Sequence, residues 1–381
     1  MNGRAPRDIP NKEHSMTKKA YLVLEDGTVY EGEHFGAETT AYGEVVFDTS
    51  MTGYQEMLTD PSFAGQLLLL TYPLIGNYGM NTVDDESPNV QARGLIVREQ
   101  CQTPSHYQSV ETLDEYLKRF GVPGIAGIDT RALTRKLRST GVMMGLLTSE
   151  LEPDKALAEL RALPPYAELA LAQEVSTNAE CVAAPAAAEG DLHVVLVDCG
   201  VKRSIIRHLN AAGCRVTVVP VSTSAERILE LAPNGVLLSP GPGDPVHLTK
   251  LEGMVSQLLG KAPMMAICLG HQVVARALGA TTFKLKFGHH GGNHPVKDLA
   301  TRRVYITTQN HGYAVDGDSL PAGLEVSHIN LNDGTVEGLR HRSYPLISIQ
   351  YHAEGTPGPL DSGYLFQEFV KLMMEHSSLA A

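Results

Sequence analysis

The chain is poor in cysteine and has no long hydrophobic run. Five cysteines occur among 381 residues, an odd number with no pair at CxxC spacing. This usage argues against a secreted disulfide framework and favours a reducing compartment, so we expect a cytoplasmic protein. No window approaches the roughly 18 uninterrupted apolar residues that a membrane helix needs, and we therefore expect no membrane segment.

Positive charge is also scarce. The net charge is −12, whereas surfaces that bind nucleic acid or anionic membranes are basic, so we expect neither partner. The chain also lacks a G-x-x-x-x-G-K-[ST] run or another clear ATP-binding signature. No nucleotide site is therefore expected in this chain.

What the chain does contain is ordinary core-forming material. Apolar residues make up 43% and charged residues 19%, which is typical of a globular protein with two or three domains. We predict a disordered extension over 1–18, a first domain over 19–173, a linker over 174–191 and a second domain over 192–381. The start, MNGRAPRDIPNKEHS, has no apolar centre and does not resemble a signal peptide. A second start at Met16 and a transit peptide remain alternatives.

The first domain is predicted to be rich in short strands. KAYLVLEDGTVY, residues 19–30, has two strand-forming runs around Asp26-Gly27, a strong hairpin signal. Strand-like pieces continue to about residue 100, and helical periodicity follows over 109–120, 129–139 and 152–163. The stretch STNAECVAAPAAAEGD is small and featureless, which is typical of a linker.

The second domain alternates strands and helices. Apolar runs such as HVVLVDCG, CRVTVVPV, GVLLS and PMMAIC are separated by helical segments, residues 283–354 carry further strand signals, and GYLFQEFVKLMMEHS closes the chain as a helix. Strands that are apolar on both faces predict a mostly parallel sheet covered by helices on both sides. Such sheets bind ligands beyond the carboxyl ends of their strands, where the SPGPGDP and CLGHQ loops fall.

Cys268 stands where a buried strand turns into a helix. Ala266 and Gly270, at −2 and +2, allow the sharp turn of a nucleophile elbow. The helix start favours the thiolate, and the N–H of Leu269 is well placed to help hold an oxyanion. A buried structural cysteine is the alternative. Cys199 also ends a strand but lacks the small-residue turn, and we predict that it belongs to the core.

A general base is available farther along the chain. His352 and Glu354 follow the strand-like run Ile347–Tyr351, and residues two apart in extended chain point the same way. Glu354 is thus able to orient the imidazole while its other nitrogen faces the thiol, as acyl transfer requires. A solvated histidine and glutamate in a loop is the alternative.

CLGHQ, PGPGDP and the His-x-Glu pair together resemble the class I (triad) glutamine amidotransferase domain, over about residues 192–378. The stretches 47–79, 124–138, 197–209 and 286–296 are similar to the family of small, glutamine-hydrolysing subunits of carbamoyl phosphate synthetase. The resemblance implies an α/β fold, in which a β-rich α+β domain precedes the class I amidotransferase domain with its mostly parallel sheet.

The resemblance also implies the roles of individual residues. Cys268 corresponds to the nucleophile, His352 to the acid/base and Glu354 to its orienter. Contacts to L-glutamine correspond to Ser50, Gly241, Gly243, Leu269, Gln272, Asn310, Gly312 and Tyr313. Three positions depart from the common family pattern, namely Pro240, Ala266 and Ala353. Ala353 replaces the usual proline and so loosens the backbone between His352 and Glu354.

The resemblance further implies a partner. A large subunit would use ATP and Mg²⁺ to make carbamoyl phosphate from bicarbonate and the released ammonia, so no cofactor is expected in this chain. The first domain would supply docking surface, and the heterodimer would be able to form a higher oligomer. Two alternatives remain: an amidotransferase that feeds anthranilate, GMP or CTP synthesis, and a catalytically silent regulatory subunit.

Two further motifs have features of ligand-binding loops. HHGGNH, residues 289–294, places three histidines close together, but it has neither a cysteine partner nor an HExxH pattern. We expect no metal there, and the resemblance to the family implies a loop near the glutamine site. PGPGDP has glycines like a phosphate-binding loop but lacks the helix-opening Gly-Lys pair.

Overall fold

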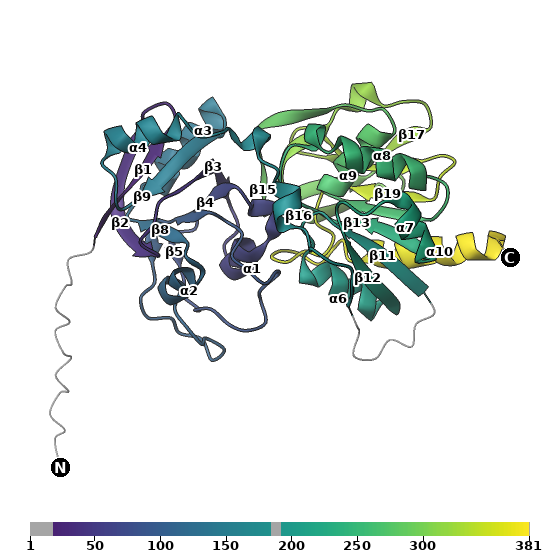
Figure 1. Cartoon of the computed structure of the whole chain (residues 1–381), viewed down its shortest axis with the longest axis horizontal. Helices are drawn as coiled ribbons and strands as arrows, with labels where there is room; N and C mark the ends of the chain where they lie inside the picture. The colour runs from purple at the N-terminus through teal and green to yellow at the C-terminus, as the bar shows by residue number, and fades with distance from the viewer. Residues whose placement is uncertain (1–17, 184–191, 381) are drawn as a thin grey trace, which may run out of the picture.

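The computed structural model describes residues 18–183 and 192–380. The predicted extension lies outside the described residues except for Lys18, as do residues 184–191 of the predicted linker. Figure 1 shows two regions side by side, a first region coloured purple to blue and a second coloured green to yellow. The mixed α/β architecture expected from the sequence is confirmed.

The first region is built on a closed barrel in the order β1-β2-β8-β6-β4-β3-β9. The predicted hairpin at Asp26-Gly27 is confirmed, since β1 and β2 pair antiparallel and Gly27 adopts a φ of 87°. The interior is apolar, and its buried side chains include Leu22, Leu67 and Ile125. The barrel strands are β1 (Lys19–Leu24), β2 (Val29–Gly36), β3 (Ala41–Asp48), β4 (Gln66–Leu70), β6 (Gly94–Ile96), β8 (Pro123–Ala126) and β9 (Met143–Thr148).

Short helices surround the barrel. The three predicted helices correspond to α2, α3 and α4, and α2 begins with a capping box between Thr112 and Glu115. The remaining elements are short and lie between the barrel strands or after α4. The bounds are α1 (Tyr54–Thr59), η1 (Pro61–Phe63), β5 (Leu74–Ile75), β7 (Glu99–Gln100), α2 (Leu113–Phe120), α3 (Thr130–Thr140), α4 (Pro153–Leu160), η2 (Tyr166–Glu168) and α5 (Leu171–Val175).

The second region contains a ten-stranded sheet in the order β10-β12-β11-β13-β14-β19-β18-β17-β15-β16. Five neighbouring strands run parallel, as predicted, namely β12, β11, β13, β14 and β19. The other neighbours in the sheet pair antiparallel. Strand bounds are β10 (Cys181–Ala183), β11 (Leu192–Asp198), β12 (Cys214–Pro220), β13 (Gly235–Leu238), β14 (Met264–Ile267), β15 (Thr282–Asp298), β16 (Val304–Val315), β17 (Leu324–Asn330), β18 (Val336–His341) and β19 (Leu346–Ile349).

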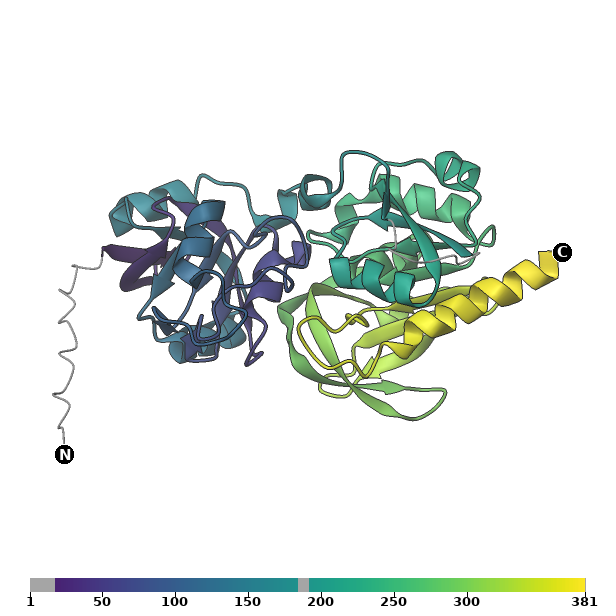
Figure 2. The same cartoon turned by 90° about the horizontal axis from the view of Figure 1, so that it is seen from below.

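Helices cover both faces of the parallel part. One face packs against α6 and α10 through residues such as Ile205, Leu209 and Phe369, and Figure 2 shows α10 lying along the sheet. The other face packs against α7, α8 and α9. The bounds are α6 (Arg203–Ala211), α7 (Ala225–Glu230), η3 (Pro245–His247), α8 (Thr249–Leu258), α9 (Leu269–Ala277), η4 (Gly317–Ser319) and α10 (Tyr364–Ala380). Within the described ranges, these and the other helices are too short or too polar to cross a membrane.

Two expectations about irregular structure are wrong. The predicted linker includes β10, which pairs antiparallel with β12 at the sheet edge. The HHGGNH stretch is not a loop but part of β15, paired with β16. Gly288 and Gly291 have positive φ values of 72° and 137° there, and the register shifts around them bend the strand. Glycine thus lets the pairing continue where the sequence suggested a turn.

Close packing at the start of α9 gives a test of the elbow. A Cβ on Gly270 would lie 2.6 Å from the Leu238 carbonyl oxygen and 2.7 Å from Leu238 Cβ. Gly270→Ala should therefore force α9 away from β13 and lower the free energy of unfolding by about 1–3 kcal/mol. Urea unfolding measures this change.

Gly253 in α8 is the matched control. It is exposed, and a Cβ there would meet nothing of the described chain within 4 Å. Gly253→Ala should leave stability unchanged or raise it by up to about 1 kcal/mol. Equal unfolding midpoints for the two variants would contradict the packing at the elbow.

Candidate active site

Cys268 occupies a strained turn at the carboxyl edge of the parallel sheet. It links β14 to α9 with φ 52° and ψ −106°, a conformation that costs a residue other than glycine about 1–3 kcal/mol. The Cys268 N–H donates to the Ile349 carbonyl at 2.9 Å, which fixes the turn against β19. The predicted sharp turn is therefore confirmed.

The thiol lines a small pocket although its residue is only 2% exposed. Cys268 Sγ lies 3.5 Å from the Asn310 carbonyl oxygen. Cys199 has no such environment, since it is fully buried in the core and burial raises the pKa of its thiol. The two strand-ending cysteines thus differ as predicted.

His352 and Glu354 form a buried pair beside the thiol. His352 Nδ1 lies 2.5 Å from Glu354 Oε1, so the ring nitrogen donates to the carboxylate. The other nitrogen, Nε2, has no hydrogen-bond partner within residues 18–183 and 192–380. The geometry requires no constraint from a proline at position 353, because His352 N–H is held by the Thr308 carbonyl at 2.9 Å.

Charges around the imidazole keep it protonated. Burial alone lowers the pKa of His352, but Glu354 and Cys268 more than offset this and raise it to about 10. Burial likewise opposes ionisation of Glu354, yet Lys202 and then His352 hold the pKa of that carboxyl far below its ordinary value. The pair is therefore an imidazolium and a carboxylate at neutral pH.

Lys202 is a functional candidate that sequence reasoning missed. Its Nζ lies 3.0 Å from Glu354 Oε1 and also donates to the Thr356 carbonyl, and both charged side chains are buried. Lys202 lies within the stretch 197–209 that is similar to the family, but nothing in the local sequence marks it as the partner of a buried carboxylate. Only the fold brings position 202 and position 354 together, and a buried carboxylate needs such a partner.

Most of the predicted substrate residues surround the pocket. Its lining includes the predicted residues Gly241, Gly243, Cys268, Gln272, Asn310, Gly312 and Tyr313. Ser50 and Leu269 are not among the described lining residues. Ser50 is half-buried and donates its backbone N–H to Asp48 at 2.6 Å. The Leu269 side chain packs toward Gly241, whose added Cβ would lie 3.0 Å from it.

Other lining residues were not predicted, and several come from the first region. They are Ser62, Gln66, Tyr166, Pro242, His290 and His311. The Tyr166 hydroxyl accepts the Gly243 N–H at 3.0 Å and so holds the PGPGDP loop in place. Local sequence carries no signal for Tyr166, because its role arises only from the packing of the two regions. For His290 the HHGGNH motif was a signal.

Asn310 connects the pocket to the first region. Its side-chain Nδ2 donates to Asp60 at 3.1 Å, and its Oδ1 accepts from His290 Nδ1 at 2.9 Å. Burial lowers the pKa of His290 to about 4, so the ring is neutral and its proton lies on Nδ1. These two side-chain contacts hold Asn310 in place, and its backbone carbonyl oxygen faces Cys268 Sγ.

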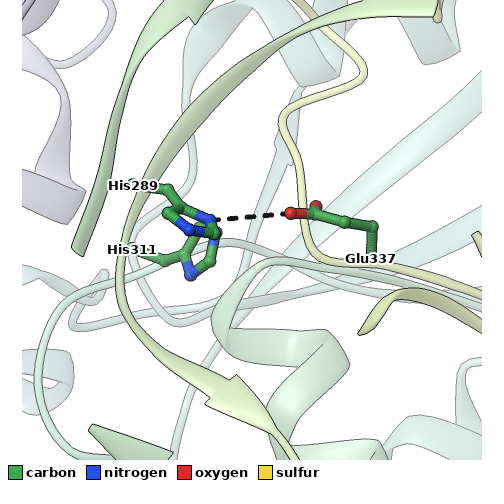
Figure 3. Close-up of side chains that lie close together, drawn as sticks. All are labelled: His289, His311 and Glu337. Atoms are coloured by element: carbon green, nitrogen blue, oxygen red, sulfur yellow. Dashed lines mark ion pairs between the residues drawn. The ribbon is translucent and has the colours of Figure 1, made fainter. Parts of the chain in front are cut away.

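Figure 3 shows that the side chains of His289, His311 and Glu337 lie close together, and His311 also lines the pocket. Their ligand-type atoms lie within 4.8 Å of one another. However, His311 Nδ1 and Nε2 already contact the Tyr313 carbonyl and Gln309. Both Glu337 oxygens accept amide N–H groups, at 2.8 and 2.9 Å. These contacts favour a hydrogen-bonded network that stiffens β15 and β16 over a metal centre.

Comparisons with known proteins cover nearly the whole chain. Residues 22–147 match the family model described as carbamoyl-phosphate synthase small chain, CPSase domain, and residues 195–372 match glutamine amidotransferase class-I.

Curated relatives extend these matches across both regions. A protein named carbamoyl phosphate synthase small chain from Staphylococcus epidermidis is 51% identical over 94% of this chain and 97% of its own length. A protein of the same name from Fusobacterium nucleatum is 53% identical over 92% of this chain and 97% of its own length. Another from Archaeoglobus fulgidus is 50% identical over 94% of this chain and 99% of its own length. Matches of this identity and coverage confirm the resemblance inferred from the motifs: the chain belongs to the carbamoyl phosphate synthase small chain family and carries a class I glutamine amidotransferase domain.

Proposed function

We propose that this chain hydrolyses L-glutamine through a cysteinyl thioester and passes the ammonia to an ATP-dependent large subunit. The observation that supports this best is the position of Cys268, on a strained elbow facing a pocket and backed by the His352–Glu354 pair. Family membership supports glutamine amidotransferase activity.

The first half-reaction forms the thioester. The Cys268 thiolate attacks the side-chain amide carbon of glutamine, and a tetrahedral oxyanion results. Backbone N–H groups of Leu269 and of the loop at Gly241 are our candidates for holding that charge. His352 Nε2–H then protonates the leaving nitrogen as the carbon–nitrogen bond breaks. Ammonia and a γ-glutamyl thioester on Cys268 are formed.

The second half-reaction returns the enzyme to its starting state. His352, now neutral, takes a proton from water, and the hydroxide attacks the thioester carbon. The carbon–sulfur bond breaks, glutamate leaves, and the thiolate and imidazolium are restored. Glu354 holds the Nδ1 proton throughout, so the ring keeps the same orientation in both halves.

We assign the substrate contacts to residues from both regions. Gly241, Gly243, Gln272 and Asn310 line the pocket and are placed to contact glutamine, together with the predicted Gly312 and Tyr313. For Ser50 the hypothesis requires a small movement toward the pocket when glutamine binds.

The released ammonia needs an acceptor reaction, and the sequence carries no clear ATP-binding signature for one. We propose that the large subunit binds ATP and Mg²⁺ and makes carbamoyl phosphate from bicarbonate for arginine and pyrimidine biosynthesis, in the cytoplasm. The first domain, proposed as residues 19–173, would provide docking surface for it. An anthranilate, GMP or CTP pathway enzyme is disfavoured by the match of residues 22–147 to the carbamoyl-phosphate synthase model. A silent subunit is disfavoured by the intact geometry at Cys268.

Replacing the nucleophile should separate the two nitrogen sources. In complex with the large subunit, Cys268→Ser should lose glutamine-dependent synthesis by about 10³-fold or more, since serine is not ionised by a neighbouring imidazolium. Synthesis from added ammonia should persist. Carbamoyl phosphate formation is measured with either nitrogen source. Cys181→Ser, at an exposed cysteine, is the control. If Cys268→Ser makes carbamoyl phosphate from glutamine as fast as this control, Cys268 is not the nucleophile.

The pH dependence should report on Glu354. Because His352 must be protonated to release ammonia and its pKa is raised to about 10, glutaminase activity should fall only as the pH rises through about 10. Glu354→Gln removes the carboxylate that raises this pKa, so the alkaline limit should move to lower pH. The rate is measured as kcat/KM of glutamine hydrolysis against pH.

Glu325→Gln provides the comparison, because Glu325 is an exposed residue paired with Arg342. Its alkaline limit should match that of the unchanged protein. An unshifted profile for Glu354→Gln would mean that Glu354 does not set the charge of His352.

A further inference from the structure

Glu86 is a buried carboxylate of the first region that reaches into the second. It lies between β5 and β6 and is only 1% exposed. Its Oε2 accepts the Ser204 N–H at 2.9 Å and the Ser204 hydroxyl at 2.6 Å, and its Oε1 lies 2.7 Å from Arg207. Its carbonyl accepts the Arg203 N–H at 2.8 Å. All of these donors belong to the first two turns of α6.

These contacts supply what α6 lacks in its own sequence. Lys202, the residue that precedes the helix, makes no side-chain cap, so the first-turn N–H groups need acceptors from elsewhere. A carboxylate at this end also interacts favourably with the helix dipole. Glu86 itself is fixed, because its N–H donates to Thr59 at 2.8 Å. The start of α6 is therefore positioned by the first region.

The same start of α6 sets the place of Lys202. Its ammonium lies 3.0 Å from Glu354 Oε1 and donates to the Thr356 carbonyl. Asp60 and Glu86 also lie near enough to stabilise the charge of this buried lysine. A shift of the helix start would carry the ammonium away from the carboxylate that orients His352.

We propose that Glu86 is a positioning residue for glutamine hydrolysis: it caps α6 from the first region and so holds Lys202 against Glu354. The inference rests on the proposed function. It adds that the first region takes part in positioning Cys268, His352 and Glu354. Glu86 acts through α6 and Lys202, because it is not among the described residues that line the pocket of Cys268.

The proposal predicts a particular kinetic pattern for Glu86→Gln in the complex with the large subunit. The kcat for glutamine hydrolysis should fall by about 10- to 100-fold, as expected when a catalytic group is misplaced. The KM should change less than about twofold, since the pocket walls are untouched. Synthesis of carbamoyl phosphate from added ammonia should stay at its normal rate, which shows that the variant folds and binds its partner.

Arg207→Met is the matched control. It removes the ion pair with Glu86 but leaves both Ser204 contacts, and the Arg207 side chain is 53% exposed. It should lower kcat much less than Glu86→Gln, because the Ser204 N–H and hydroxyl still hold the Glu86 carboxylate against α6. If Arg207→Met lowers kcat as much as Glu86→Gln, the role assigned to the cap of α6 is wrong.

A double variant separates positioning from general destabilisation. If Glu86 acts through Lys202, Glu86→Gln combined with Lys202→Met should be no slower than Lys202→Met alone. Independent structural effects would instead multiply, and that result would overturn the proposal. Should Glu86→Gln fail to fold, Ser204→Ala removes the shortest of these contacts without burying an unpaired carboxylate, and a smaller loss of kcat at constant KM is expected.

The outcome also distinguishes this inference from the proposed function. If the unchanged complex does not hydrolyse glutamine, the proposed function itself is wrong. If the unchanged complex hydrolyses glutamine and both Glu86→Gln and Ser204→Ala keep full kcat, only the positioning role is wrong.

Discussion

The buried charges around Glu354 are the constraint on which the rest of the site depends. An ionised carboxylate inside a protein is costly unless it is paired, and here Lys202 and His352 both contact the same Oε1. This arrangement keeps the imidazole protonated and turned so that Nε2 faces Cys268. The elbow then supplies the thiol, and the Asp60–Asn310–His290 contacts fix the pocket wall opposite it. Without the Glu354 carboxylate, the proposed mechanism would lose the protonated His352 that it requires, although the residues lining the pocket would remain.

The site is assembled from both regions of the molecule. The second region contributes Cys268, His352 and Glu354. The first region contributes Tyr166, whose hydroxyl accepts the Gly243 N–H, and Asp60, which accepts a hydrogen bond from the Asn310 side chain. Glu86 extends this role to α6. A barrel region that only bound a partner would not need buried polar contacts of this kind. The two parts are therefore expected to fold against each other before the site is complete.

Sequence alone predicted the parts of this account that depend on local pattern. Alternating apolar strands and helices predicted the parallel sheet, small residues around Cys268 predicted the elbow, and a spacing of two predicted the contact of His352 with Glu354. It did not predict Lys202 as the buried partner of Glu354, because an isolated lysine at a helix start is usually exposed. Tyr166 was missed because nothing local marks a contact between regions. The HHGGNH strand was mistaken for a loop, since glycines permit a bulge as readily as a turn.

Trapping the intermediate tests the central claim most directly. The protein is mixed with isotopically labelled glutamine, quenched in acid within milliseconds to seconds, and digested for mass spectrometry. The account predicts a peptide containing Cys268 that carries one labelled γ-glutamyl group, which hydroxylamine releases because thioesters are labile to it. The modification should be missing from the Cys268→Ser protein. Glutamine turnover without any acylated Cys268 peptide, or with the label on another residue, would contradict the account.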